Sequence, residues 1–287
     1  MPRIAYVNGA YTPLRDAAIS IEDRGFLFAD SVYEVWSVFG GQLADLDGHL
    51  NRLERSLGEL QIAMPMPRHA LLVVLNEVIR RNRILEGMVY LQVSRGAAPR
   101  DHVFPAGVNP GIVITARPVD REAAADKAER GIKTISVPDI RWGRCDIKTT
   151  GLLPNVLAKQ AAKEQGAAEV IFVDRDGYVT EGGSTNVYMV GDDGVIRTRN
   201  LKANILPGVT RLNLLSVIAE SGLDVREEAF TLDEAKNARE VFVSAATSLV
   251  MPVVAIDGKV IGNGAPGLIA TALREAYIDQ ARRTAGV

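Results

Sequence analysis

Short strands and helices alternate along this 287-residue chain in meanders, without a repeating strand–helix–strand order. The dipeptide Asn8-Gly9 predicts a hairpin, because Asn-Gly is the strongest short turn signal. Residues 31–39 (SVYEVWSVF) are rich in β-branched and aromatic side chains and predict a strand. A helix follows, indicated by apolar positions three and four residues apart: Leu46, Leu50, Leu53, Leu57 and Leu60. This mixture predicts an α+β fold, not a doubly wound parallel sheet.

The remaining expected elements have the same mixed character. We expect further helices over residues 67–83, 155–165 and 210–221, from 231 onward, and over 266–283. We expect further strands over residues 88–95, 111–117, 132–137, 169–173, 178–180, 187–190, 195–197 and 240–244. The charged, alanine-rich run 118–131 begins as a linker, which predicts a small N-terminal domain over 1–119 and a larger C-terminal domain over 120–287.

Composition excludes several classes of function. The hydrophobic content of 47% is ample for large cores, while a net charge of -2 gives no field that would recruit nucleic acid or anionic membrane. No apolar run reaches membrane-spanning length and the N-terminus does not read as a signal peptide, so a cytoplasmic protein is expected. The one cysteine, Cys145, cannot form an intramolecular disulfide and is interpreted as a packed small side chain.

Lys148 is the first candidate for chemistry. It follows an isoleucine and precedes Thr-Thr-Gly-Leu-Leu, where the chain is expected to turn inward. A lysine partly removed from water loses proton affinity and becomes a usable nucleophile and base, which a Schiff-base lysine requires. The same stretch is also typical of a surface lysine at a strand end, so both interpretations stay open at this point.

Three segments are suited to an anion. The segment 208–211 (GVTR) opens a helix, and free backbone N–H groups at a helix N-terminus suit a phosphate, although Thr210 as an ordinary cap explains it equally well. The segment 244–248 (SAATS) ends an apolar strand with small residues that let a ligand approach the backbone, or it is a plain loop. Arg52 borders the leucine stripe and is either a phosphate clamp or a snorkelling side chain.

Glu181 lies in a glycine-rich bend, where a carboxylate is common in turns but could also accompany a pyridinium nitrogen. Other cofactor signatures are missing: there is no P-loop, and Gly182-Gly183 lacks the third glycine and the following helix of a dinucleotide-binding motif. The three histidines are too scattered for a zinc site.

Taken in order, several segments resemble the fold-type IV pyridoxal-phosphate enzymes, and most closely the D-amino-acid aminotransferases. The matching segments are EDRG at 22–25, SVYEV at 31–35, HLNRL at 49–53, RGAAPRDH at 95–102, 139–148 with Lys148, TEG at 180–182, STN at 184–186 and GVTR at 208–211. The resemblance implies a two-domain fold with a smaller N-terminal α/β domain and a larger, pseudo-barrel C-terminal domain that binds pyridoxal 5'-phosphate.

The resemblance also implies roles for individual residues. Lys148 would hold the cofactor as an internal aldimine and move the proton, in a ping-pong reaction that passes through pyridoxamine phosphate. Glu181 would keep the pyridine nitrogen protonated. The phosphate would be bound by Arg52, Val209, Thr210, Ala246 and Thr247. The family's best-known members carry Ser-Thr-Thr where this chain has Ala245-Ala246-Thr247, so backbone N–H groups would replace two hydroxyls.

Tyr33, Arg100 and His102 are the substrate residues that the resemblance implies. Arg100 and His102 would lie on a loop that reaches across a homodimer interface, completes the site there and grips the α-carboxylate of the substrate. This Arg-x-His pair favours transamination between a D-amino acid and a 2-oxo acid. The alternatives are a branched-chain L-amino-acid transaminase, an R-selective amine transaminase or an aminodeoxychorismate lyase of the same fold.

Overall fold

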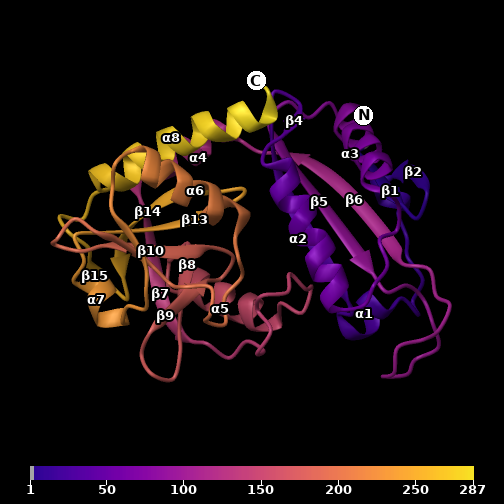
Figure 1. Cartoon of the computed structure of the whole chain (residues 1–287), viewed down its shortest axis with the longest axis horizontal. Coiled ribbons are helices and arrows are strands. Elements are labelled where there is room, and N and C mark those ends of the chain that lie inside the picture. Colours follow the sequence, from indigo (N-terminus) through magenta and orange to yellow (C-terminus); the bar gives the residue numbers. More distant parts are fainter. Residues whose placement is uncertain (1–2) are drawn as a thin grey trace. The chain divides into compact units, whose positions relative to one another are not determined.

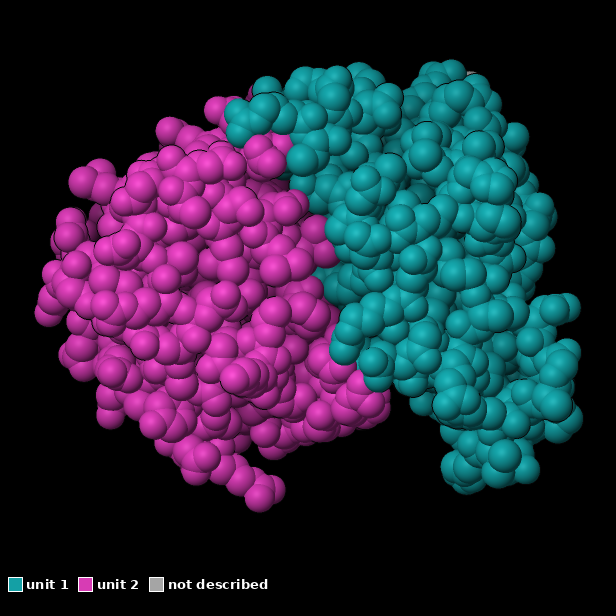
Figure 2. Space-filling model, in the orientation of Figure 1, with its two compact units in different colours: residues 1–120, 147–151, 281–287 teal, residues 121–146, 152–280 magenta. Residues whose placement is uncertain are grey.

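The computed structural model describes residues 3–287 and divides the chain into two compact units. Unit 1 contains residues 1–120, 147–151 and 281–287, and unit 2 contains residues 121–146 and 152–280 (Figure 2). The domain boundary expected after residue 119 stays a prediction, and the units differ from it by assigning 147–151 and 281–287 to unit 1.

Unit 1 is built on a six-stranded antiparallel sheet (Figure 1). Its strands are β1 (Ile4–Val7), β2 (Ala10–Pro13), β3 (Ser31–Phe39), β4 (Gln42–Leu43), β5 (Gly87–Ser94) and β6 (Gly111–Pro118), in the order β2-β1-β6-β5-β3-β4. Its helices are α1 (Arg24–Phe28), α2 (Leu46–Glu59) and α3 (Arg68–Asn82), with a 3-10 turn at Leu14–Asp16.

The two faces of strand β3 have different surroundings. Trp36 belongs to the buried core that joins the sheet to α2 and α3, together with Leu53 from the leucine stripe and Leu75 from α3. Successive side chains of a strand point to opposite faces, so Tyr33 lies on the other face, where its ring stacks on Tyr90 of β5. The strand therefore presents one face to a helix-covered core and the other to the candidate site.

Unit 2 is built on a nine-stranded mixed sheet. Its strands are β7 (Ile132–Pro138), β8 (Glu169–Val173), β9 (Val179–Gly182), β10 (Asn186–Val190), β11 (Ile196–Thr198), β12 (Val225–Glu227), β13 (Glu240–Ala245), β14 (Leu249–Ile256) and β15 (Lys259–Val260). The order is β12-β11-β10-β13-β14-β7-β8-β9, with β15 on β14. Only residues 183–185 join β9 to β10, yet four strands separate the two in this order, so the sheet must curl back on itself.

The helices of unit 2 begin at recognisable signals. They are α4 (Arg121–Arg130), α5 (Leu153–Glu164), α6 (Val209–Glu220), α7 (Leu232–Lys236) and α8 (Leu268–Ala285). The Thr231 hydroxyl accepts from the Glu234 amide and the Glu234 carboxylate accepts from the Thr231 amide, which is the capping box that starts α7. None of the helices in residues 3–287 combines the length and apolarity needed to cross a bilayer.

The structure confirms the α+β arrangement and adds elements that the sequence pattern did not predict. The strand over 31–39, the leucine-stripe helix and the Asn8-Gly9 hairpin are confirmed. The additions include α1, β4, β12 and the long strand β14, and the run 118–131 contains α4 beyond its linker start. Strand β14 holds Pro252 in its interior, a residue that normally argues against a central strand, yet it pairs with both β13 and β7.

Candidate active site

Lys148 is fixed by a short segment that runs beside the first half of β3. The amide of Tyr33 donates to the Lys148 carbonyl at 3.0 Å, and Val32 forms an isolated antiparallel bridge with Thr149. On the other side of the segment, the Lys148 amide donates to the hydroxyl of Ser56 in α2 at 3.3 Å. Backbone hydrogen bonds to a strand and a helix therefore hold the Lys148 main chain in one position.

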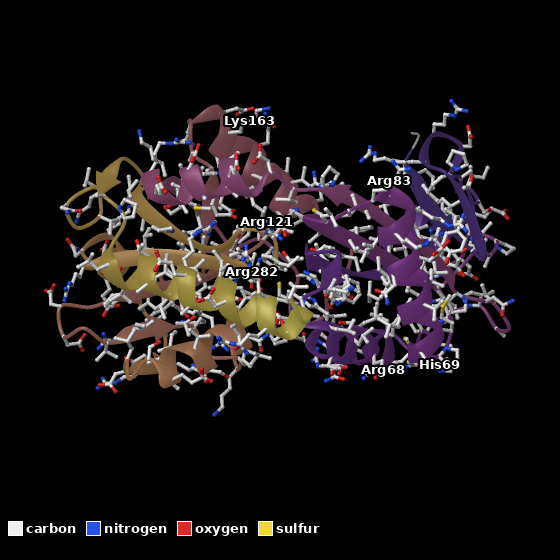
Figure 3. The ribbon with its side chains drawn as sticks, turned by 90° about the horizontal axis from the view of Figure 1, so that it is seen from above. Arg68, His69, Arg83, Arg121, Lys163 and Arg282 are labelled. Carbon is white, nitrogen blue, oxygen red and sulfur yellow. The ribbon has the colours of Figure 1, made fainter. Side chains whose placement is uncertain are left out.

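The Lys148 side chain lies on the face of β3 that carries Tyr33. Its Nζ lies 4.2 Å from the centroid of the Tyr33 ring, in the geometry of a cation–π contact. The Tyr33 ring in turn stacks on Tyr90 at 5.7 Å, so the amine rests on a rigid aromatic pair. Lys148 is half-buried, whereas Lys163 on α5 is exposed and extends away from the ribbon in Figure 3.

Arg52 is buried in α2 and bound to Glu34 of β3. Its Nε donates to Oε1 and its Nη2 to Oε2 of that carboxylate, both at 2.7 Å. Arg52 lies one turn before Ser56, the residue that accepts from the Lys148 amide. The ion pair thus fixes the guanidinium within unit 1, one helical turn from the residue that anchors the Lys148 backbone.

His49 completes this buried group. Its Nδ1 lies 2.7 Å from Glu34 Oε2, and its ring is tilted against Trp36 at 5.4 Å. Burial alone would raise the pKa of Glu34, but the charge and hydrogen bonds of Arg52 lower it to about 2. Burial lowers the pKa of His49, so the ring is neutral at neutral pH and Arg52 and Glu34 carry the charges.

Arg100 and His102 have exposed side chains on the loop between β5 and β6. Both contact the ring of Phe28: the Arg100 guanidinium carbon lies 5.1 Å from its centroid, and the His102 ring lies 5.4 Å away. The loop therefore presents a guanidinium and an imidazole that both contact one ring, and both groups are of types that bind a carboxylate.

Glu181 is a buried carboxylate at the end of β9 with three nitrogen donors around it. Arg141 Nη1 donates to Oε1, while the Leu206 amide at 3.1 Å and Asn186 Nδ2 at 3.4 Å donate to Oε2. Burial alone would lower the pKa of Arg141, but the hydrogen bond of Asp139 and the charge of Glu181 raise it. The permanently charged guanidinium of Arg141 thus forms an ion pair with Glu181.

The start of α6 is connected to Glu181 through Asn186. Asn186 Nδ2 also donates to the Leu206 carbonyl at 3.2 Å, and a Cβ on Gly208 would come within 2.1 Å of Asn186 Oδ1. Gly208 precedes the first helical residue and no side chain caps this end, so the first amides of α6 have no partner inside the helix. Val209 and Thr210 are both buried here.

Ala246 and Thr247 lie in the turn that joins β13 to β14. The turn is followed by Leu249, whose φ of 58° is left-handed. The Ser248 carbonyl accepts from Arg274 of α8 at 3.0 Å, and its hydroxyl is buried without a hydrogen-bond partner among residues 3–287. A small, tightly bent segment with a buried hydroxyl is suited to contact a ligand.

The structure groups the candidate residues by unit. In unit 1, Lys148 contacts Tyr33, and its backbone is bonded to Ser56, one helical turn after Arg52. In unit 2, Glu181 accepts a hydrogen bond from the Leu206 amide, which precedes the start of α6. Sequence reasoning assigned no role to Arg141 or Asn186, the two partners of Glu181. A signal existed for Arg141, which stands two residues after the carboxylate of Asp139 and forms an ion pair with it at 2.6 Å.

Cys145 is buried near this cluster and is not a reactive thiol. Burial, together with the charges of Glu181 and Asp139, raises its pKa to about 11 although Arg141 opposes the change. The thiol is therefore protonated at neutral pH, as expected for a packed side chain. The described residues also contain no group of His, Cys, Asp and Glu arranged to hold a metal ion.

Comparisons with known proteins identify the family. The model of the amino-transferase class IV family matches residues 31–256. The D-alanine aminotransferase of Bacillus licheniformis is 41% identical over 281 residues, covering 96% of this chain and 98% of its own. That of Staphylococcus haemolyticus is 40% identical over 273 residues, covering 95% of each. The branched-chain amino acid aminotransferase of Escherichia coli has a TM-score of 0.90 at 24% identity, covering 98% of this chain and 95% of that one.

The chain belongs to the class IV aminotransferase family. The resemblance seen in the sequence and the fold that it implied are both confirmed, and the structural match at 24% identity supports the fold alone. The chain is a pyridoxal-phosphate-dependent transaminase of this family. Its relatives include D-alanine aminotransferases that are about 40% identical to it.

Proposed function

We infer that this protein catalyses ping-pong transfer of an amino group between a D-amino acid and a 2-oxo acid, with pyridoxal 5'-phosphate as cofactor. The observation that carries this conclusion is the identity of 41% and 40% with D-alanine aminotransferases over nearly the whole chain. The structural likeness to a branched-chain amino acid aminotransferase does not favour the alternative, because at 24% identity it concerns the fold.

The residues of unit 2 fit the cofactor. An uncapped helix start at α6 offers amides to a phosphate, and the absence of a Cβ at Gly208 lets Asn186 pack against that helix start. An ionised Glu181 suits a protonated pyridine nitrogen. We propose that Val209, Thr210, Ala246 and Thr247 bind the phosphate, with Arg52 of unit 1. When bound, the cofactor supplies the electron sink that carbanion chemistry at the substrate Cα requires.

Lys148 is proposed as the covalent anchor for the cofactor and as the base that takes the proton from the substrate Cα. The contact with the Tyr33 ring and the fixed backbone restrict where its Nζ can move. A base that is already oriented avoids the entropy cost of positioning it at each turnover. In the second half-reaction Lys148 would deliver a proton to the same face of the Cα that comes from the 2-oxo acid, so the amino acid formed would again have the D configuration.

Arg100, His102 and Tyr33 are proposed to bind the substrate, with Arg100 and His102 on its α-carboxylate. The carboxylate position decides which hydrogen of Cα faces Lys148, so this pair would select the D-enantiomer. A charged hydrogen bond from a guanidinium to a carboxylate is among the stronger polar contacts in proteins, which makes Arg100 the main determinant of affinity.

We further propose a homodimer in which the Arg100–His102 loop completes the site of the other subunit, and a cytoplasmic location. Support for an interface comes from large apolar side chains that are exposed in each unit. In unit 1 these are Ile21, Phe26 and Val103, which are 81%, 70% and 72% exposed. In unit 2 they include Leu153 and Leu157 on α5, which are 68% and 58% exposed. Exposed apolar side chains that form a continuous patch mark interaction surfaces, and we propose that these residues lie in the subunit interface.

A half-reaction panel tests the assignment. Purified protein loaded with pyridoxal phosphate is mixed with D-alanine, D-glutamate, L-alanine, L-leucine or R-1-phenylethylamine, and the cofactor absorbance is followed. We expect rapid spectral conversion by the D-amino acids and slow conversion by the other three donors. Faster conversion by L-leucine or by the simple amine would replace the D-amino-acid assignment with one of the alternatives.

A further inference from the structure

Arg24 connects α1 to the loop that carries Arg100 and His102. Its side chain is 4% exposed, and its Nη1 and Nη2 donate to the backbone carbonyls of Asp101 and His102, the latter at 3.5 Å. These carbonyls belong to the two residues that follow Arg100. A single buried guanidinium thus holds the backbone on which both proposed carboxylate-binding side chains are mounted.

The main chain around Arg24 holds the beginning of the same loop. The Arg24 amide donates to the Gly96 carbonyl at 2.9 Å, and the Ala98 amide donates to the Glu22 carbonyl at 3.2 Å. Gly96 has φ +106°, and a Cβ there would come within 2.1 Å of the Asn109 carbonyl oxygen, so the loop begins in a conformation that suits glycine. The loop is therefore fixed at its start by backbone contacts and further along by the Arg24 side chain.

Asp30 pairs with both Arg24 and Arg95 and so connects Arg24 to the sheet. Its Oδ2 accepts from Arg24 Nε at 2.7 Å and from Arg95 Nε at 2.7 Å. Burial alone would raise the pKa of Asp30, but hydrogen bonds from Arg95 and Arg24 lower it below its ordinary value. Arg95 follows β5 and also donates to the Leu60 carbonyl at 2.7 Å, which links the group to the end of α2.

The ring of Phe28 links Arg24 to the two exposed side chains. The Arg24 guanidinium carbon lies 4.8 Å from the ring centroid, and Arg100 and His102 both contact the same ring. Arg24 thus contributes to the environment of Arg100 and His102 through the backbone and through this ring, without lying on the loop itself.

We propose that Arg24 is a positioning residue for substrate recognition, which orders the loop so that Arg100 and His102 can bind the α-carboxylate. This inference rests on the proposed function of those two residues. A planar guanidinium can donate to Asp30 and to two carbonyls at once, whereas a lysine ammonium cannot reproduce that geometry. A loop ordered before binding avoids part of the entropy cost of ordering it around each substrate.

The test compares Arg24→Met, Arg24→Lys, Arg100→Ala and the double variant Arg24→Met/Arg100→Ala in the cofactor-loaded enzyme with D-alanine and pyruvate. We expect Arg24→Met to raise KM for D-alanine about tenfold, with kcat within about twofold, because binding of the carboxylate is what is lost. In the Arg100→Ala background, Arg24→Met should cost little more, since it acts through a side chain that is already removed.

Hydrogen exchange gives a second readout that does not depend on turnover. Amides of residues 97–104 should exchange faster in Arg24→Met than in the wild type, because their backbone anchor is gone. The matched control is Arg68→Met, which removes an arginine that pairs with Glu54 on the surface of the same unit (Figure 3) and should leave both KM and this exchange unchanged. If Arg24→Met does not fold, Arg24→Lys keeps a positive charge beside Asp30 and should still raise KM.

Distinct outcomes separate this proposal from the function on which it rests. The positioning role is overturned if Arg100→Ala raises KM while Arg24→Met has the wild-type KM. If only Arg24→Lys folds, a wild-type KM for that variant has the same consequence. Fully multiplicative effects of Arg24→Met and Arg100→Ala overturn it as well, because they indicate a general structural role. A wild-type KM for Arg100→Ala overturns the carboxylate assignment and this proposal together.

Discussion

Arg52 of α2 and Glu34 of β3 form a bidentate ion pair inside the core of unit 1, with both nitrogen–oxygen distances at 2.7 Å. Glu34 is fully buried and Arg52 is 8% exposed, so neither charge is solvated by bulk water. A pair of this kind is costly to break, because removal of one partner leaves the other charged and unpaired. It orients the one proposed phosphate ligand of unit 1 before any cofactor arrives.

Glu34→Gln should destabilise the protein most at neutral pH. The folded-state pKa of about 2 lies below the ordinary value of 4.5, so the ionised carboxylate stabilises the fold above pH 4.5, and this contribution is lost as the pH falls toward 2. The shift corresponds to roughly 3 kcal/mol. Urea unfolding should therefore show a difference of that order between wild type and variant at pH 7, shrinking steadily below pH 4.5.

The matched control for this experiment is Glu54→Gln, which removes a half-exposed ion pair with Arg68. Exposed pairs contribute about 0–1 kcal/mol, so the free energy of unfolding of this variant should differ little from that of the wild type at pH 7 and at pH 3. An equal loss of stability for Glu34→Gln at pH 7 and pH 3 would contradict a titrating role for the buried carboxylate.

Lys148→Ala should abolish transamination and leave the fold intact. The side chain lies over the Tyr33 ring, and the segment is held through its backbone, which alanine preserves. Turnover of D-alanine and the cofactor absorbance band report on the chemistry, and circular dichroism reports on the fold. Lys163→Ala, at an exposed position of α5, should behave as wild type. Appreciable turnover by Lys148→Ala would show that another base carries the reaction.

Gly208→Ala should weaken cofactor binding. The new Cβ would approach Asn186 Oδ1 within 2.1 Å, and Asn186 cannot move away without disturbing its bonds to Glu181 and the Leu206 carbonyl. Titration with pyridoxal phosphate should give a Kd raised about tenfold or more, a change equivalent to one good hydrogen bond. Gly143→Ala is the control, since nothing lies within 4 Å of a Cβ there. An unchanged Kd would remove the start of α6 from the phosphate site.

Cys145 should react slowly with thiol reagents in the native protein. Burial raises its pKa to about 11 from the ordinary 9.0, which lowers the thiolate fraction at pH 8 about a hundredfold before access is considered. Reaction with a chromogenic disulfide should release one equivalent rapidly in urea and only slowly without it. Equal rates in the two conditions would mean that the thiol is accessible in the folded state.

Sequence patterns predicted those elements whose signals are local. The leucine stripe of α2, the capping box of Thr231 and the alternation in β3 each depend on neighbours within a few residues, and all three are confirmed. Strand β14 was missed because Pro252 interrupts it and because a strand buried on both faces shows no alternation.

The partners inside the site were harder to predict, because they join residues far apart in the chain. Arg141 meets Glu181 across 40 positions, and Arg24 meets the Asp101 carbonyl across 77. The type of each side chain is visible in the sequence, but the pairing depends on sheet order and on the curl of unit 2. Family resemblance supplied the roles of Lys148 and Glu181 as predictions, and it did not supply their neighbours.

The segment 147–151, with Lys148, packs with unit 1 although the residues on both sides of it belong to unit 2. During synthesis, unit 1 therefore cannot be completed when residue 120 leaves the ribosome. The Tyr33 amide can pair with the Lys148 carbonyl, and the Asp45 amide with the Thr284 hydroxyl, only after these much later residues have been synthesised. Contacts of such long sequence separation slow folding. Until residues 148 and 149 pair with β3, part of that strand has an unpaired edge, which is a site where aggregation can begin and where chaperones can bind.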